Sequence, residues 1–104
     1  MNTTVVGLLT MAAFAALMQP AGAAGAGMGE RMAKRWCAAC HVVAADQARG
    51  ATQAPPFSEI AKRPGFDAGK VALFLLVPHP RMPDMNLSRV EAADLAAYIA
   101  QQGK

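Results

Sequence analysis

The sequence predicts an all-α protein with a single domain. Apolar residues recur at helical spacing in several segments, and prolines and glycines separate those segments. No segment alternates apolar and polar residues as a half-buried strand does. With 104 residues, the chain has room for one domain, whose core we expect to be built from helices alone.

The N-terminal residues 1–23 are expected to be a secretory signal peptide. Residues 5–18 form an apolar, uncharged run that small residues follow. The run is shorter than the roughly 20 residues that a membrane-spanning helix needs. Cleavage after Ala23 would leave residues 24–104 as an exported, periplasmic domain. An uncleaved anchor is the alternative, because no Lys or Arg precedes the apolar run.

The first helix of the domain is expected over residues 28–39. Charged residues occupy its other faces, and the apolar residues that share one face are Met28, Met32, Trp36 and Ala39. An irregular segment follows, broken by glycine and proline. Two short helices are then expected over residues 57–63 and 67–77, each followed by proline.

The last helix is expected over residues 88–102. Ser88 and Glu91 match the S-x-x-E capping box at its start, and Leu95 and Tyr98 follow at helical spacing. The domain carries all the charged residues of the chain, with a net charge of +3. A domain this small usually needs a disulfide, a metal or a cofactor to complete its core.

The segment RWCAACHVV contains the only two cysteines, Cys37 and Cys40, and His41 follows the second directly. A redox-active C-x-x-C pair usually lies between a strand and a helix, and no strand is expected here. A zinc site needs four ligands, and the chain has two cysteines and two histidines. C-x-x-C-H is the attachment motif of haem c. Two thiols one helical turn apart can reach the two haem vinyl groups, with the histidine beneath the iron.

The sequence resembles the class I c-type cytochromes, small monohaem carriers of bacterial periplasms. The resemblance covers residues 29–102 and rests on Gly29 before CAACH, on APPF and RMPDMNLS, and on DLAAYI in the last helix. It implies a cytochrome c-like fold, with three to four helices around one covalently attached haem c. It also implies that the first and last helices cross, here with Gly29 against Tyr98.

One position departs from the family pattern. Relatives often have an aromatic residue where this chain has Ala33. The crossing is therefore expected to depend more on the core packing of Met32, Trp36 and Leu95.

The resemblance implies that His41 is the proximal ligand of the haem iron and that a methionine is the distal one. The family places that methionine before a proline, with an apolar residue three positions later. Met82 fits, with Met85 in the apolar position, so Met82 is the expected ligand and Met85 the alternative. Met28 and Met32 are expected in the core. His79, between two prolines, is expected at the haem edge or the surface.

The resemblance also implies a role for the carbonyl of Pro55, or alternatively of Pro56. It would accept a hydrogen bond from the second ring nitrogen of His41 and so orient the ligand. Basic residues around an exposed haem edge would steer acidic redox partners. Six basic residues are expected simply on solvated faces, and would have this role only if several of them surround the haem edge: Arg31, Lys34, Arg35, Lys62, Arg63 and Arg81.

The sequence therefore predicts a periplasmic one-electron carrier with a His/Met-ligated haem c and its iron. It is expected to have no catalytic residue, no small-molecule substrate, no nucleic-acid partner and no membrane anchor. One alternative is a haem c subunit of a specific dehydrogenase or oxidase. Another is a ligand-binding or peroxidatic haem protein with an open sixth position, which the RMPDM loop disfavours.

Overall fold

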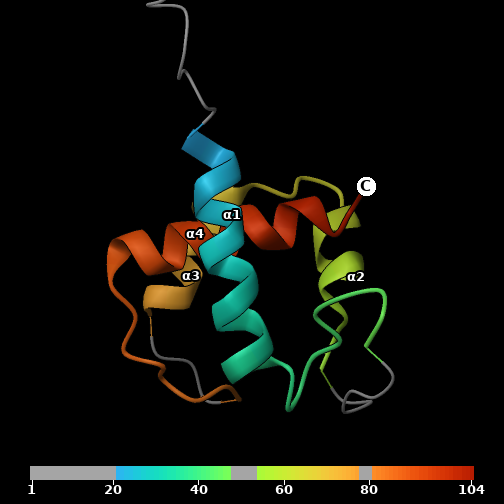
Figure 1. The fold of residues 1–104 in the computed structure, drawn as a ribbon, viewed down its shortest axis with the longest axis horizontal. Coiled ribbons are helices and arrows are strands. Elements are labelled where there is room, and N and C mark those ends of the chain that lie inside the picture. The colour runs from blue at the N-terminus through green and yellow to red at the C-terminus, as the bar shows by residue number, and fades with distance from the viewer. Residues whose placement is uncertain (1–20, 48–53, 78–80) are drawn as a thin grey trace, which may run out of the picture.

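The fold consists of helices around a small core (Figure 1). The computed structural model describes residues 21–47, 54–77 and 81–104. Its α-helices are α1 (Ala21–Met32), α2 (Phe57–Lys62), α3 (Ala68–Leu76) and α4 (Arg89–Gln101), and a π-helical turn, η1 (Ala33–Cys37), continues α1. These described ranges contain no strand, which confirms the all-α class. Two expectations concern residues outside the described ranges: the signal peptide, for residues 1–20, and the place of His79 at the haem edge or the surface.

Helices α1 and α4 cross, as the first and last helices were expected to do (Figure 1). Gly29 lies at the crossing. A Cβ atom built there would overlap the backbone oxygen of Asp94 and would lie 2.8 Å from the Cβ of Tyr98. Only a residue without a side chain permits this approach, so the predicted contact between Gly29 and Tyr98 is confirmed.

The predicted extent and buried face of the first helix are wrong in part. The helix begins at Ala21 rather than Met28, because the Ala/Gly run before Met28 gives no apolar periodicity to detect. Met32 is buried as expected, but Met28 and Trp36 are 44% and 37% exposed.

The physical reason for this difference is the combination of the close crossing and the π-helical turn. The buried face is centred on Gly29 and Ala33, where the absence of large side chains lets α4 approach. In η1, the backbone N–H of Ala38 donates to the carbonyl of Ala33, five residues earlier, at 3.0 Å. The wider turn shifts the helical register and carries Trp36 off the core face. The guanidinium of Arg35 lies 5.9 Å from the centre of the Trp36 ring.

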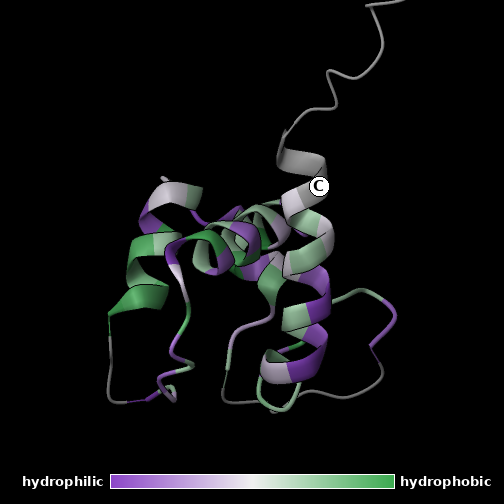
Figure 2. Cartoon of the chain, turned by 60° about the vertical axis from the view of Figure 1, so that its left-hand side comes forward, coloured by the Kyte–Doolittle hydropathy of each residue, from purple (hydrophilic) through white to green (hydrophobic). Residues whose placement is uncertain are grey.

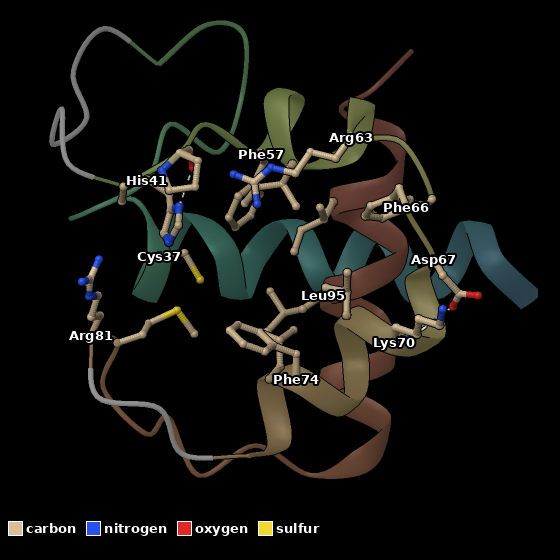
Figure 3. Close-up of a pocket in the computed structure, with 18 of the residues that line it drawn as sticks. Cys37, His41, Phe57, Arg63, Phe66, Asp67, Lys70, Phe74, Arg81 and Leu95 are labelled. Carbon is tan, nitrogen blue, oxygen red and sulfur yellow. Dashed lines mark hydrogen bonds between the residues drawn. The ribbon is translucent and has the colours of Figure 1, made fainter.

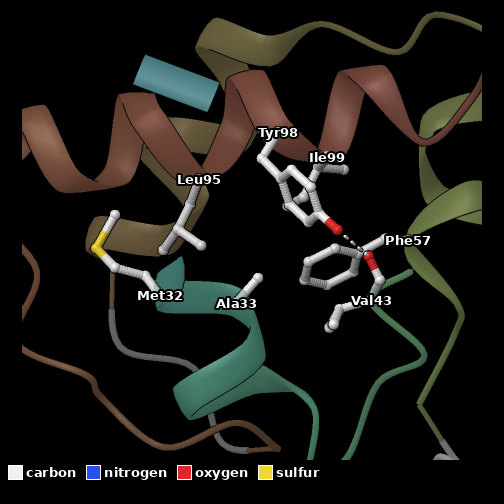
Figure 4. Packing of buried hydrophobic residues seen from close by; sticks show 7 residues of the cluster. All are labelled: Met32, Ala33, Val43, Phe57, Leu95, Tyr98 and Ile99. Atoms are coloured by element: carbon white, nitrogen blue, oxygen red, sulfur yellow. Dashed lines mark hydrogen bonds between the residues drawn. The ribbon is translucent and has the colours of Figure 1, made fainter. Parts of the chain in front are cut away.

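The core lies between α1, α4 and the start of α2 (Figure 4). Within it, the rings of Phe57 and Tyr98 meet edge to face at 6.3 Å between centroids. The residues of the cluster are Met32, Ala33, Val43, Phe57, Leu95, Tyr98 and Ile99. Leu95 therefore packs in the core, as expected.

Side-chain caps start the two C-terminal helices. Asp67 precedes α3, and its carboxylate accepts from the backbone N–H of Lys70 at 3.0 Å. At α4, Ser88 accepts from the N–H of Glu91 at 3.1 Å, while Glu91 accepts from the N–H of Ser88 at 2.9 Å. The capping box predicted from the sequence is thus present.

Helix α3 differs from the other α-helices because it has no buried residue. Figure 2 shows that its C-terminal part, where it meets the trace of residues 78–80, is hydrophobic. Phe74, for example, is 55% exposed. None of the helices in the described ranges is long and apolar enough to cross a membrane.

Candidate haem site

A cavity of about 690 Å³ opens beside the core (Figure 3). Its walls come from η1, the segment before α2, the helices α2, α3 and α4, and the loop that precedes α4. Most of the lining side chains are apolar, among them Phe57, Phe66, Val71, Phe74 and Leu95. The volume is within the range of about 300–1,000 Å³ that is typical of ligand pockets.

His41 lies on the wall of this cavity, and its ring has a defined orientation (Figure 3). Its Nδ1 atom is 2.7 Å from the carbonyl oxygen of Pro55. A carbonyl oxygen only accepts hydrogen bonds, so the ring proton is on Nδ1, which donates it. In a neutral ring with that tautomer, Nε2 carries a lone pair and can bind a metal.

A second hydrogen bond explains why Pro55 lies so close to His41. The backbone N–H of Phe57 donates to the carbonyl of Val42 at 2.9 Å. This bond holds the segment after the cysteines beside the segment that starts α2. The ring of Phe57 also packs against the ring of His41, with centroids 5.3 Å apart.

The two cysteines differ in their surroundings. Cys37 lines the cavity, while Cys40 is exposed and is not among the residues of the cavity wall. The backbone N–H groups of Cys40 and His41 both donate to the carbonyl of Cys37, at 3.1 and 2.8 Å, so the motif forms a tight turn. Burial, with a smaller contribution from Cys40, raises the pKa of the Cys37 thiol to about 11.

The structure also bears on the two competing chemistries of the C-x-x-C pair. In the described ranges the cysteines lie at the end of η1 and in the turn after it, and no strand lies next to them as in a disulfide oxidoreductase. Within the described ranges, no three side chains of His, Cys, Asp or Glu come together as a metal site.

The loop before α4 supplies Arg81 and Met82 to the cavity wall. Met82 and Met85 are both partly buried, but Met85 is not among the residues that line the cavity. Asn86 has a left-handed backbone with φ of 53°, and its N–H donates to the Asp84 carboxylate at 2.8 Å. This turn separates the part of the loop at the cavity from the start of α4.

The basic residues fall into two groups. Arg63 and Arg81 line the cavity, together with Lys70, which the sequence did not single out. Lys34, by contrast, forms an ion pair with Glu30 at 2.7 Å on the surface of the first helix.

Gln47 and Phe57 are functional candidates that the sequence did not reveal. Phe57 belongs to the APPF segment, but nothing there showed that its ring would meet His41. Gln47 makes hydrogen bonds to the backbone around His41 from a segment without periodicity. No pattern in the sequence could have identified it.

The residues of the cavity fit a haem. His41 offers a nitrogen lone pair, Cys37 a thiol and Met82 a thioether to the same space. The apolar walls suit a porphyrin, and the exposed cations Arg63, Lys70 and Arg81 suit its carboxylates.

Comparison with known proteins agrees with this fit. Cytochrome c-552 of Bradyrhizobium diazoefficiens is 50% identical to the chain over 99 residues, which is 95% of each sequence. No protein-family model matches the chain, and no solved structure does. The chain therefore belongs to the class I c-type cytochromes, electron-transfer proteins rather than enzymes, and its cofactor is one covalently attached haem c with its iron.

Proposed function

We propose that this cytochrome is a periplasmic one-electron carrier whose haem iron is ligated by His41 and Met82. Cys37 and Cys40 would form the two thioether bonds to the haem. The observation that carries the proposal is the 2.7 Å hydrogen bond from His41 to the Pro55 carbonyl on the wall of a large apolar cavity. It orients a metal-binding nitrogen in a space that Cys37 and Met82 also line.

The hydrogen bond to Pro55 has two consequences for His41. It sets the tautomer and the orientation of the ring, and it makes the opposite nitrogen a stronger donor to a metal. The ring of Phe57 packs against the imidazole and limits the access of water from that side. The proximal ligand would therefore keep one geometry in both oxidation states of the iron.

Met82 is preferred over Met85 because only Met82 lines the cavity. Pro83 follows Met82 and restricts its backbone to extended angles, which holds this part of the loop off a helical path. A thioether opposite a histidine raises the reduction potential and closes the sixth coordination position. When bound, the haem supplies the one-electron iron couple, and this pair of ligands suits outer-sphere transfer without substrate binding.

Three exposed cations support docking to acidic redox partners. Arg63, Lys70 and Arg81 line the cavity and are also accessible to solvent. Positive charge near the haem edge would increase the rate of encounter with negatively charged partners. This increase would become smaller as salt is added, because salt screens the attraction. Such a dependence on ionic strength is expected for the rate of electron transfer.

The proposal places the carrier in the periplasm without a membrane anchor. Residues 1–23 would act as the signal peptide, and residues 24–104 would form the haem domain. The support is the apolar run of residues 5–18, the small residues after it and the exported location implied by haem c attachment. The proposed cleavage bond after Ala23 falls in the first turn of α1.

An intact mass and an absorption spectrum of the protein purified from the periplasm test the proposal. We expect the mass of residues 24–104 plus one haem, a low-spin spectrum when reduced, and the methionine-to-iron charge-transfer band when oxidised. Replacing His41 with alanine should abolish the low-spin spectrum. A mass that retains residues 1–23 would contradict cleavage, and a ferric protein without the charge-transfer band would contradict methionine ligation.

A further inference from the structure

Gln47 closes the short loop that follows His41. Its side-chain oxygen accepts from the backbone N–H of Val43 at 2.8 Å. Its side-chain nitrogen donates to the carbonyls of His41 at 2.9 Å and of Ala38 at 3.2 Å. Carbonyls only accept and N–H groups only donate, so these partners allow a single orientation of the amide.

Of the two carbonyls that Gln47 binds, that of Ala38 belongs to the C-cap of η1, and that of His41 lies at the end of the turn that follows. The last carbonyls of a helix have no partner within the helix and need donors from elsewhere. Gln47 supplies such a donor to Ala38 and a second one to His41 from one side chain. It therefore acts as a cap for the turn that contains Cys37, Cys40 and His41.

Gln47 also connects this turn to the core. The N–H of Val43 donates to Gln47, and the carbonyl of Val43 accepts from the hydroxyl of Tyr98 on α4 at 2.6 Å. The side chain of Val43 is 1% exposed, so its backbone has little freedom to move. Through Val43, the amide that holds the backbone of His41 is tied to the best-packed helix of the fold.

We propose that Gln47 is a positioning residue for the proximal ligand: it holds the backbone of His41 so that the imidazole keeps its hydrogen bond to Pro55. This inference rests on the proposed role of His41. The backbone carbonyl of His41 is held by Gln47 and the ring by Pro55, so the residue is fixed at two points. Loss of the hydrogen bond from Gln47 would let His41 rotate, and this rotation would weaken the hydrogen bond from the ring to Pro55. A weaker bond to Pro55 makes the imidazole a poorer donor to ferric iron, which raises the reduction potential.

The test is Gln47→Leu in the holoprotein, with Gln101→Leu as the matched control. Leucine removes all three hydrogen bonds without adding a group that binds iron. Gln101 is an exposed residue at the end of α4 and is not among the residues that line the cavity, so its replacement makes the same chemical change outside the site. The readouts are the reduction potential and the haem methyl resonances of the ferric protein, which report the orientation of the axial imidazole.

We expect Gln47→Leu to raise the potential and move the methyl resonances, and Gln101→Leu to change neither. If Gln47→Leu does not retain haem, the second variant is Gln47→Asn, which keeps the amide on a shorter side chain. It should shift the potential and the methyl resonances in the same direction, but by less. Wild-type values in the variant that holds haem would overturn the inference. The role of His41 is tested separately: an unchanged spectrum in His41→Ala would refute the proposed ligation, whatever the Gln47 variants show.

Discussion

The hydroxyl of Tyr98 donates a hydrogen bond of 2.6 Å to the carbonyl oxygen of Val43, and both residues are buried. The bond joins the C-terminal helix to the loop after the haem-attachment motif, 55 residues earlier in the chain (Figure 4). Tyr98 thus has two roles. Its Cβ faces Gly29 at the helix crossing, and its hydroxyl anchors the segment that follows His41.

Tyr98→Phe should destabilise the holoprotein by about 1–3 kcal/mol. The ring would keep its packing against Phe57, but the buried carbonyl of Val43 would lose its donor. Denaturant unfolding followed by circular dichroism measures the change. Tyr98→Leu should cost more, because it also removes the aromatic contact. Equal stability of Tyr98→Phe and the wild type would show that the hydrogen bond contributes nothing.

Gly29→Ala and Gly27→Ala should have opposite effects on stability. A Cβ at Gly29 would overlap the backbone of α4 and force the two helices apart. Gly29→Ala should therefore lower the free energy of unfolding by about 1–3 kcal/mol or more. A Cβ at Gly27 meets nothing within 4 Å, and alanine is favoured over glycine inside a helix by roughly 0.5–1 kcal/mol. Thermal unfolding of both holoprotein variants checks the pair. A neutral Gly29→Ala would contradict the close crossing.

Met82→Ala should open the sixth coordination position of the iron. The potential should fall, carbon monoxide should bind the reduced protein, and the charge-transfer band of the oxidised protein should disappear. Met85→Leu conserves size and apolarity, so it should keep the band at a cost below about 1.5 kcal/mol. Absorption spectra and redox titration measure both variants. If the two results were exchanged, Met85 would be the ligand.

Cys37→Ala and Cys40→Ala should each give little stable holoprotein when expressed with a haem-attachment system. The buried apolar core is small, and the cavity beside it is left unfilled without haem. Haem staining of denatured samples and the yield of folded protein are the measurements. Abundant folded protein without haem, from either variant, would refute the dependence of folding on the cofactor.

Glu91→Gln should change how stability depends on pH. Hydrogen bonds from the backbone and then the side chain of Ser88 lower the pKa of the Glu91 carboxyl below its ordinary value of 4.5. A lowered folded-state pKa gives stability that is present above pH 4.5 and is lost as the pH falls through the folded value. The free energy of unfolding, measured from pH 7 to pH 3, should therefore fall less steeply in Glu91→Gln than in the wild type. Parallel curves would contradict the contribution of the capping box.

The helices themselves were largely determined by local sequence. The spacing of Leu95 and Tyr98 and the Ser88 box predicted α4, and prolines marked the ends of the two short helices. These signals depend on residues within one or two turns of each other, which is why they can be read without a structure. The C-x-x-C-H motif is local for the same reason, since its geometry spans a single turn.

The buried faces of the helices and the surroundings of the proposed ligands were decided by tertiary structure. Helical spacing put Met28 and Trp36 in the core, but the crossing at Gly29 and the π-helical turn buried a neighbouring face instead. The choice between Met82 and Met85 depends on which one reaches the cavity, and that follows from the path of a whole loop.

The support of His41 is the clearest case of a feature that only the fold determines. Pro55 was expected from family resemblance, whereas Gln47 and the hydroxyl of Tyr98 gave no signal in the sequence. Side-chain hydrogen bonds to the backbone of a distant segment leave no periodic pattern, because their partners are peptide groups that every residue carries. The sequence by itself therefore determined the elements and the cofactor motif, while the packing of α4 against the loop decided how the backbone around His41 is held.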